Sequence, residues 1–354
     1  MRQLFFSIIV VMLTVACANV RSPLPREKAS ESLDSAFTSY LSAVRERSLD
    51  LHSIMVIQHG KVLEEAQLAP DTAHVMFSVS KTFTSAAVGF AIDDGLLSLD
   101  DRIVDIFDDH LPEQYSPQLE KITLRHLLTM TCGHGNDPTY NYMEKDVDWI
   151  KAFMEWPIEF EPGSCFCYNS LGTFILSAAV QKVTGKRLVD YLETRLWEPL
   201  GIEKPFWQVN SQGINTGGWG LFLRTEDMAR MGICLLNEGR FGGRQVIPKW
   251  WVKEMETKHV DSSPAHFNRQ QADAIIDNLD HPQHDFFSKA AKDWLWGYGY
   301  QMWLCPDGAV RADGSKGQFI IVIPNKDAVI VTTAHISNMA LELKQIWDYI
   351  VPAL

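Results

Sequence analysis

The chain has few cysteines, no cluster of basic residues and no internal repeats. Six of its 354 residues are cysteine, and no two of them form a C-x-x-C pair. Structural zinc sites are usually built on such pairs, so the sequence argues against one. Lys and Arg total 32 against 44 Asp and Glu, which gives a net charge of −12 and a pI near 5.4. This negative field repels nucleic acid and anionic membrane surfaces, and we expect no nucleic-acid partner.

The cysteines leave the disulfide pattern open. Cys17 falls in the N-terminal segment discussed next, and the five others are odd in number, so at least one lacks an intramolecular disulfide partner. Cys165 and Cys167 are too close for an easy bridge in a regular strand, because alternation points both side chains the same way about 7 Å apart.

The first 18 residues have the pattern of a signal peptide. Arg2 precedes an apolar-rich stretch from Leu4 to Ala16, which is roughly 13 residues and short of the roughly 18 that span a bilayer. Ala16-Cys17-Ala18 supplies the small residues of a signal-peptidase site, and the same letters form a poor lipobox centred on Cys17. We therefore expect an exported protein, periplasmic or secreted, with a membrane-anchored lipoprotein as the alternative.

Mass spectrometry of the N-terminus of the cellular protein separates these outcomes. Cleavage after Ala18 would start the mature chain at Asn19, whereas lipidation would retain Cys17 as the first residue. An intact Met1 would contradict export by either route.

The remaining chain is divided into a polar linker over residues 19–31 and one domain over residues 32–354. Hydrophobic spacing and turn residues predict these elements: a helix over 32–47, a hairpin over 51–66 with His59-Gly60 in its turn, a helix closed by Gly95, a mostly helical block over 121–250 with helix starts at Thr123, Ser170 and Thr225, a strand over 294–300, a hairpin over 317–334 and a helix over 338–350. This order predicts an α/β (α+β) fold, with helices flanking an antiparallel sheet and a mostly helical inserted subdomain.

A serine and a lysine three residues apart begin an almost wholly apolar segment, "SVSKTFTSAAVGF". On a helix, Ser78 and Lys81 share one face. Burying a charged lysine in an apolar segment costs free energy, which indicates a function for the amine. A serine beside an amine at the positive end of a helix could provide a nucleophile, a base and one oxyanion donor. The alternative is that Ser78 caps the helix and Lys81 extends to water.

A second stretch, "PGSCFCYNS", places Tyr168 and Ser170 directly before another apolar helix. With it, the chain resembles the serine hydrolases of the penicillin-binding protein and class C β-lactamase superfamily. Further matching phrases occur in the same order along the chain: "ITLRHLLTMTCG" (122–133), "GGWGLFLRTEDMARMGICLLNEGRFGGRQVIP" (217–248) and "GYGYQMW" (297–303). The resemblance extends from about residue 35 to the C-terminus.

The resemblance implies a role for each matching residue. Ser78 corresponds to the nucleophile that becomes acylated, and Lys81 to the lysine that takes or relays its proton. Tyr168 corresponds to the general base or acid that faces the leaving group. Ser170 corresponds to the position, usually asparagine, that hydrogen-bonds the lysine. This chemistry requires the pKa of Lys81 to lie near neutrality.

The third motif of the family departs from the penicillin-recognising pattern. Those enzymes place Lys or His two residues before a glycine on the strand that lines the site, whereas this chain has Ala312 two residues before Gly314. The departure resembles the esterase and 6-aminohexanoate-dimer hydrolase branch. By that comparison, the backbone N–H of Ser315 is the second oxyanion donor beside that of Ser78. A clamp for a substrate carboxylate is missing unless Arg311 or Lys316 substitutes.

We expect a hydrolase that cleaves an ester or amide of a small-molecule or peptide-like substrate, with no metal and no cofactor. A His/Asp group in the polar loop 261–292, formed by Asp280, His281, His284 and Asp285, could hold a metal, but polar loops often have this composition. Two alternatives stay open: a D,D-carboxypeptidase or weak β-lactamase, and a sensor or scaffold without turnover. The natural substrate depends on loops such as 134–148 and 261–292.

Overall fold

The centre of the structure is a six-stranded antiparallel sheet in the order β2-β1-β10-β9-β8-β7. This computed structural model describes residues 22–262 and 291–354. The sheet joins strands from residues 51–67 to strands from residues 303–334, so these two parts of the chain meet as the sequence predicted, but with four late strands where three were expected. The strands are β1 (Leu51–Gln58), β2 (Lys61–Gln67), β7 (Trp303–Leu304), β8 (Val310–Gly314), β9 (Gln318–Ile323) and β10 (Ala328–Ala334).

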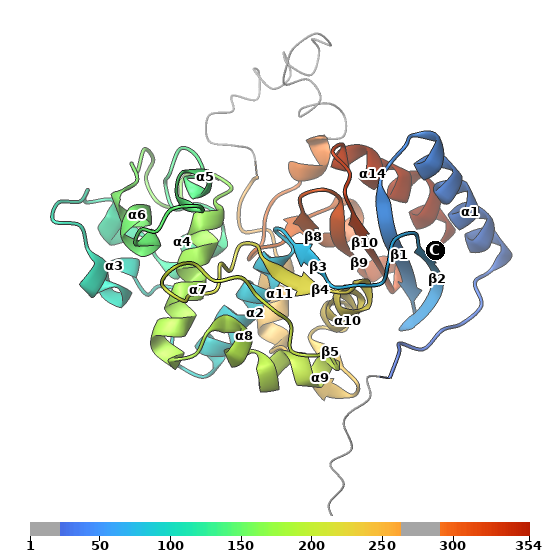
Figure 1. The fold of residues 1–354 in the computed structure, drawn as a ribbon, viewed down its shortest axis with the longest axis horizontal. Helices are drawn as coiled ribbons and strands as arrows, with labels where there is room; N and C mark the ends of the chain where they lie inside the picture. Colours follow the sequence, from blue (N-terminus) through green and yellow to red (C-terminus); the bar gives the residue numbers. More distant parts are fainter. Residues whose placement is uncertain (1–21, 263–290) are drawn as a thin grey trace, which may run out of the picture.

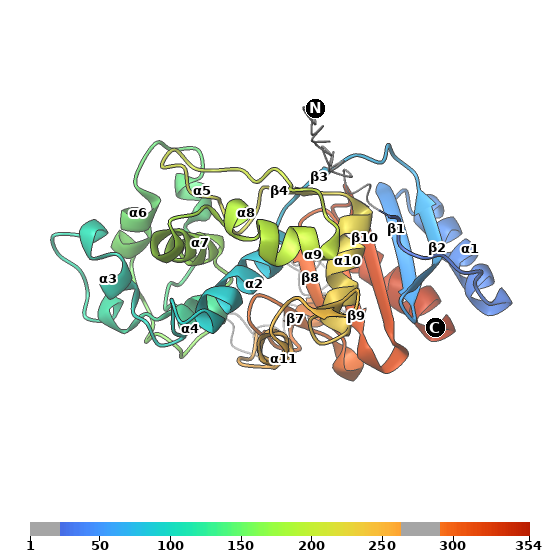
Figure 2. The ribbon, with the colours of Figure 1, turned by 90° about the horizontal axis from the view of Figure 1, so that it is seen from below.

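Helices cover both faces of this sheet (Figures 1 and 2). On one face lie α1 (Glu31–Glu46), α14 (Met339–Gln345) and the π-helical turn Ile346–Ile350 that extends α14. On the other face lies α10 (Thr225–Leu236), which contacts β1, β9 and β10. Strand alternation explains the two layers, because Ile54 and Val56 pack with α1 whereas Met55 and Ile57 face the larger core.

The helical part is inserted between β2 and β7 and contributes most of the larger hydrophobic core. Its two long central helices, α2 and α7, pack against each other. The elements are β3 (His74–Met76), α2 (Ser80–Asp93), α3 (Ile103–Ile106), α4 (Leu124–Leu128), α5 (Thr139–Tyr142), α6 (Trp149–Glu155), α7 (Ser170–Thr184), α8 (Leu188–Tyr191), α9 (Glu198–Leu200), β4 (Leu221–Leu223), β5 (Arg240–Phe241), β6 (Arg244–Gln245) and α11 (Lys249–Glu256). β3 pairs with β4 in a separate small sheet, and β5 pairs with β6.

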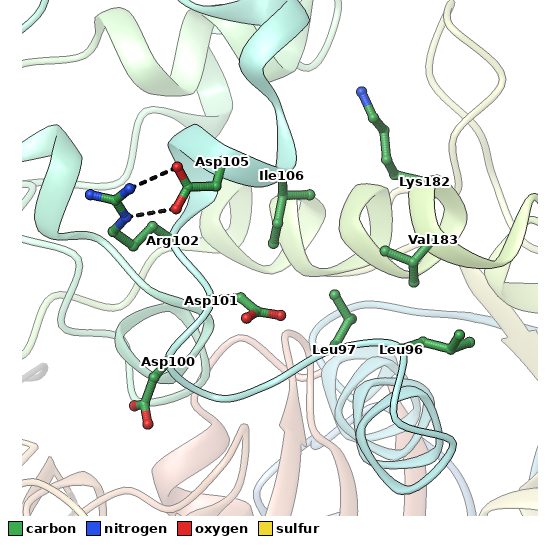
Figure 3. Close-up of a pocket in the computed structure, with 9 residues that line it drawn as sticks. All are labelled: Leu96, Leu97, Asp100, Asp101, Arg102, Asp105, Ile106, Lys182 and Val183. Atoms are coloured by element: carbon green, nitrogen blue, oxygen red, sulfur yellow. Dashed lines mark hydrogen bonds and ion pairs between the residues drawn. The ribbon is translucent and has the colours of Figure 1, made fainter.

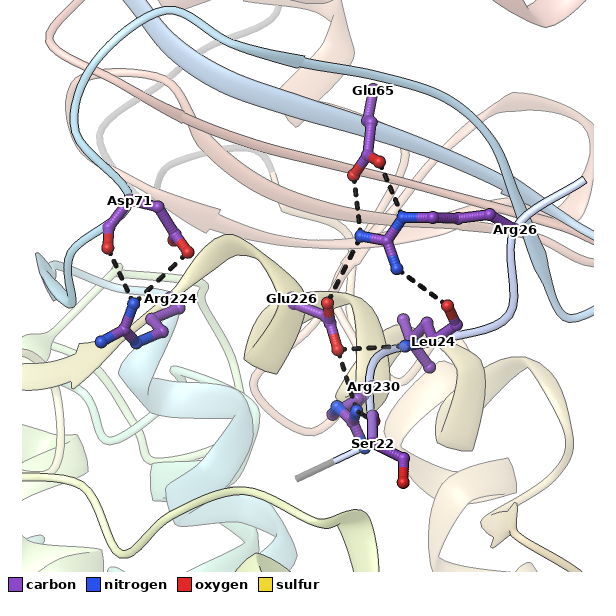
Figure 4. A network of polar contacts seen from close by, with 8 residues as sticks. All are labelled: Ser22, Leu24, Arg26, Glu65, Asp71, Arg224, Glu226 and Arg230. Atoms are coloured by element: carbon purple, nitrogen blue, oxygen red, sulfur yellow. Dashed lines mark hydrogen bonds and ion pairs between the residues drawn. The ribbon is translucent and has the colours of Figure 1, made fainter. Parts of the chain in front are cut away.

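The segment assigned to a linker is bound to the fold over residues 22–30. Arg26 binds Glu65 of β2 through two hydrogen bonds and also contacts Glu226 of α10, as Figure 4 shows. Glu226 in turn accepts hydrogen bonds from the Leu24 backbone and from Arg230. These contacts tie the start of the described chain to both a strand and a helix of the domain.

Most predicted elements match the observed ones. The first hairpin turns at His59 and Gly60, which both have positive φ, as such two-residue turns require. The strand predicted over 294–300 is wrong: Trp294 ends a 3₁₀ turn (Ala291–Trp294), and the strand of this region is Trp303–Leu304. The aromatic alternation there does not mark a strand ladder: Trp294 lies against Arg311, Trp296 is exposed, and Tyr300 is buried in the larger core.

Two predicted features fall outside the described ranges. The signal peptide and Cys17 lie in residues 1–21, and the His/Asp group of the polar loop lies in residues 263–290. In the two described ranges, no helix combines the length and apolar character needed to cross a bilayer.

Candidate active site

Ser78 lies in the tight turn between β3 and α2, two residues before the helix begins at Ser80. The turn is closed by a hydrogen bond from the Lys81 backbone N–H to the Ser78 carbonyl (3.0 Å). It places Lys81 in the first turn of α2, and the Lys81 side chain reaches back to Ser78, with 3.0 Å between Nζ and Oγ. The predicted nucleophile and base are therefore adjacent.

The Lys81 amine is enclosed by acceptors from three segments of the chain. Besides Ser78 Oγ, Nζ donates to Ser170 Oγ and to the Gly218 carbonyl, each at 3.0 Å. The residue is only 1% exposed. Burial lowers the pKa of Lys81 from 10.5 to about 7, against an opposing attraction from Asp137. The alternative in which Lys81 extends to water is thus wrong.

A near-neutral pKa changes what the amine can do. An ammonium group has three donors and no acceptor, and all three would be used by the observed partners. The neutral amine keeps two donors, for Ser170 and Gly218, and turns its lone pair toward the Ser78 hydroxyl. In that state Lys81 is placed to accept the Ser78 proton.

Ser170 is held by the start of α7. Asn169 caps this helix through its side-chain oxygen, which accepts from Gly172 N (2.8 Å). The Asn169 amide donates to Nδ1 of buried His134 (3.0 Å), whose pKa burial lowers to about 4. The His134 imidazole is therefore neutral near pH 7. The two hydrogen bonds of Asn169 hold the start of α7 in place, and with it the adjacent Ser170.

Asp137 lies beside the same helix start. One carboxylate oxygen accepts from the Ser170 backbone N–H (3.0 Å), and the other accepts from the backbone and hydroxyl of Thr139 (3.0 and 2.5 Å). A carboxylate at a helix N-terminus is favoured by the helix dipole. Ser170 also accepts from Lys81 Nζ, so it contacts both Asp137 and the amine. The Asp137 carboxylate attracts the charged form of Lys81.

Tyr168 joins the same cluster through its ring and its hydroxyl. The ring centroid is 4.8 Å from Lys81 Nζ, and the ring stacks on Trp303 at 5.4 Å. Burial raises the pKa of Tyr168 well above its usual range, and a hydrogen bond with the Ser78 side chain acts in the opposite direction. The hydroxyl consequently stays protonated at neutral pH.

Gly314 and Ser315 lie at the end of β8, next to the turn that carries Ser78. A methyl group on Gly314 would come 3.2 Å from Val79 Cγ2, so the backbone of β8 approaches the residue after Ser78 closely. Ser315 follows in the β8–β9 turn and is exposed. The structure thus brings the two predicted oxyanion segments side by side.

The missing carboxylate clamp is not replaced by Arg311. Ala312 is buried in the larger core, and Arg311, on the opposite face of β8, is fully buried. Its Nε donates to Asp313 (2.8 Å), its Nη1 donates to Cys305 Sγ (3.0 Å), and its guanidinium lies over the Trp294 ring. Lys316, partly exposed in the β8–β9 turn, is the remaining candidate from the sequence.

A pocket elsewhere on the molecule contains none of these residues. It lies between the α2–α3 connection, α3 and the end of α7, and its lining includes Leu97, Asp101 and Lys182 (Figure 3). Arg102 and Asp105 at its edge are paired with each other. Within residues 22–262 and 291–354, no three His, Cys, Asp or Glu side chains gather in a way that could hold a metal ion.

The comparison with known proteins agrees with this geometry. The model of the family described as Beta-lactamase matches residues 52–353. The chain belongs to the Beta-lactamase family. The resemblance inferred from the sequence motifs is confirmed, and with it the fold of an antiparallel sheet flanked by helices.

Relatives in this family carry different names. The 6-aminohexanoate-dimer hydrolase of Paenarthrobacter ureafaciens is 25% identical over 224 residues, 57% of this chain and 56% of that protein. A β-lactamase of Yersinia enterocolitica is 22% identical over 265 residues, covering 74% and 65%. The matches to the first curated relatives thus span little more than half of their length. These hydrolase-named relatives support a serine hydrolase and leave the substrate open.

Solved structures of low sequence identity show the same fold. The octameric penicillin-binding protein homologue from Pyrococcus abyssi superposes with a TM-score of 0.65 at 19% identity, covering 89% of this chain and 77% of that one. The fold is therefore shared well beyond the range in which sequence identity alone is informative.

Sequence reasoning missed three contributors to the site. Gly218 lies within a phrase that matches the family, but its carbonyl contact with Lys81 leaves no sequence signal. Asp137 lies in the loop 134–148, which was considered only for substrate choice. Gln318, whose side chain binds the backbone on both sides of Met76, was treated as part of a hairpin.

Replacing Asp137 by Asn should shift the pH dependence of activity. Asp137 attracts the Lys81 ammonium, so its removal lowers the pKa of Lys81 further below 7. Because only the neutral amine can accept the Ser78 proton, the acid limb of the kcat/KM profile for p-nitrophenyl acetate should move to lower pH.

Asp105→Asn is the matched control, because it removes the same charge from an exposed ion pair with Arg102. Its acid limb should coincide with that of the unmodified protein. An unchanged or higher-pH limb in folded Asp137→Asn would show that this carboxylate does not act on Lys81.

Proposed function

We propose that the protein hydrolyses an ester or amide through an acyl-enzyme on Ser78. The contact between buried Lys81 and Ser78 Oγ carries this proposal, because a lysine with a pKa of about 7 can deprotonate a serine in contact with it. The other polar groups of the site accompany that pair: Ser170 and Gly218 hold the amine, and the Tyr168 hydroxyl is protonated beside the nucleophile.

In the first half of the reaction, Ser78 Oγ forms a bond to the carbonyl carbon while its proton passes to Lys81 Nζ. The resulting oxyanion is bound by the backbone N–H groups of Ser78 and Ser315. The bond to the leaving group then breaks, and the leaving oxygen or nitrogen takes a proton from the Tyr168 hydroxyl, which recovers one from Lys81. In the second half, water attacks the carbonyl carbon of the acyl-enzyme with the same groups taking and returning the proton. The bond to Ser78 Oγ breaks, the acid is released, and Ser78 regains its proton.

The alternatives from the sequence make different demands on the site. A D,D-carboxypeptidase or β-lactamase binds a substrate carboxylate beside the scissile amide, and Ala312 and the buried Arg311 provide no cation for it. A sensor that acylates without turnover needs the same nucleophile but no efficient water attack. Steady-state turnover of a generic ester separates the sensor from the enzyme.

A fluorophosphonate probe should label the purified protein once, at Ser78. Ser78→Ala should abolish labelling and reduce esterase activity by at least about 10³-fold, since the covalent route is lost. Lys81→Ala and Lys81→Arg should both be nearly inactive, because a guanidinium stays charged at any working pH and cannot take the proton.

Circular dichroism and thermal unfolding of these variants check that they are folded. Labelling that survives Ser78→Ala would refute the assignment of the nucleophile. An active Lys81→Arg variant would mean that Lys81 acts as a fixed charge and not as a base.

Short-chain p-nitrophenyl esters should be hydrolysed at least about tenfold more efficiently than nitrocefin. The expected charge-assisted hydrogen bond to the nitrocefin carboxylate is missing, at a cost of about 1.5–3 kcal/mol, and every 1.4 kcal/mol is tenfold. Comparing kcat/KM for p-nitrophenyl acetate, p-nitrophenyl butyrate and nitrocefin tests this preference. A higher value for nitrocefin than for both esters would show that another cation, with Lys316 as the first candidate, supplies the clamp.

A further inference from the structure

Through its side chain, Gln318 connects the six-stranded sheet to the small β3–β4 sheet, and the strands of these two sheets are not paired with each other through their backbones. It is the first residue of β9 in the six-stranded sheet and is 3% exposed. Its side-chain Oε1 accepts from the Phe77 backbone N–H (2.8 Å), and its Nε2 donates to the Val75 carbonyl (2.7 Å). The carboxamide thus offers the donor and acceptor that a neighbouring strand would offer, and it binds β3 and the residue after it.

These contacts lie between the two segments that carry the proposed oxyanion donors. Phe77 immediately precedes Ser78 on one side. On the other side, Gln318 pairs with Gly314 across the β8–β9 ladder, and a methyl group on Gly314 would come 2.6 Å from Gln318 Oε1. The Gln318 side chain therefore lies between the Ser78 turn and the β8–β9 turn, beside the close approach of Val79 to Gly314.

The β8–β9 turn itself is held from the opposite side. The Thr332 hydroxyl donates to the Gly317 carbonyl and the Ile336 N–H donates to the Lys316 carbonyl, both at 2.9 Å. Lys316 and Gly317 have φ of 72° and 83°, in the left-handed region that an isolated chain seldom adopts at a lysine. The conformation of the β8–β9 turn thus depends on contacts with its neighbours. Among these, the Gln318 side chain contacts Phe77, the residue before Ser78.

We propose that Gln318 is a positioning residue that sets the spacing of the Ser78 and Ser315 backbone N–H groups around the oxyanion. It does not touch the substrate, and the inference rests on the proposed function of Ser78. Loss of one oxyanion donor costs about 10²–10³ in kcat, so loosening the spacing should cost roughly tenfold or more. KM should change little, because full charge develops on the oxygen only in the transition state.

Thionoesters provide a readout that a merely structural role would not move. Sulfur is larger than oxygen and a weaker hydrogen-bond acceptor, so a well-spaced pair of donors favours the oxygen ester strongly. We compare kcat/KM for p-nitrophenyl acetate with that for its thiono analogue. Gln318→Met keeps the side-chain volume but makes neither hydrogen bond, and the oxygen-to-sulfur ratio should fall at least about fivefold.

Two further variants control this measurement. Gln318→Glu keeps an acceptor for the Phe77 N–H, so its ratio should lie between those of Gln318→Met and the unmodified protein. Gln301→Ala removes another buried glutamine, which accepts from Thr173 and donates to the carbonyls of Leu127 and Leu128, on α7 and α4. Its loss should lower stability without changing the ratio.

Rates are normalised to the sites titrated by the fluorophosphonate probe, so that only folded, reactive protein is compared. An unchanged ratio in either Gln318 variant, or an equal fall in Gln301→Ala, overturns the inference. If Gln318→Met yields no reactive protein, Gln318→Glu decides by the same criterion. Full activity of Ser78→Ala would instead refute the proposed function, so the two failures are distinguishable.

Discussion

The burial of one amine is the constraint on which the site depends. Lowering the pKa of Lys81 from 10.5 to about 7 corresponds to on the order of 5 kcal/mol that disfavours its charged form. At Lys81 the folded chain therefore binds fewer protons than the unfolded chain between pH 7 and 10.5, so the contribution of this residue to stability rises with pH across that window. Burying Lys81 therefore lowers stability at pH values where the amine is charged. Strongly shifted pKa values of this kind are concentrated at functional sites, where stability is given up for activity.

The hydrogen bonds of the Lys81 amine bring together parts of the chain that are far apart in sequence. Its three acceptors come from the turn before α2, the start of α7 and the segment before β4. Each has its own support: Asn169 caps α7, and β3, which leads into the Ser78 turn, pairs with β4, which follows Gly218. Gln318 adds the link to the large sheet. The helical part and the sheet therefore meet at Lys81, and their packing fixes the geometry of the nucleophile.

The elements that could be predicted are those with a local cause. The hairpin at His59 and Gly60 follows from turn chemistry, and the helix from Ser170 follows from its cap and its apolar residues. The spacing of Ser78 and Lys81 at the start of an apolar helix singled out that pair, whereas Tyr168 was indicated only by the family resemblance. Asp137 and Gln318 could not be found, since their partners are 33 and 241 residues away. The strand predicted at 294–300 had the right alternation, but its aromatic side chains lie in different surroundings, with Trp296 exposed and Tyr300 buried in the larger core.

The third motif shows how strand alternation restricts which residue can replace a lost cation. Arg311 is adjacent to Ala312 in sequence, yet neighbouring residues of a strand face opposite sides, and Arg311 points away from the larger core. There it is held by Asp313 and Cys305. Turning Arg311 toward a substrate would leave the Asp313 carboxylate buried without its partner, and breaking a buried ion pair in this way costs about 3–5 kcal/mol. A new carboxylate contact would return only about 1.5–3 kcal/mol. The ion pair therefore keeps Arg311 out of the site, so the arginine beside Ala312 in sequence does not supply the missing clamp.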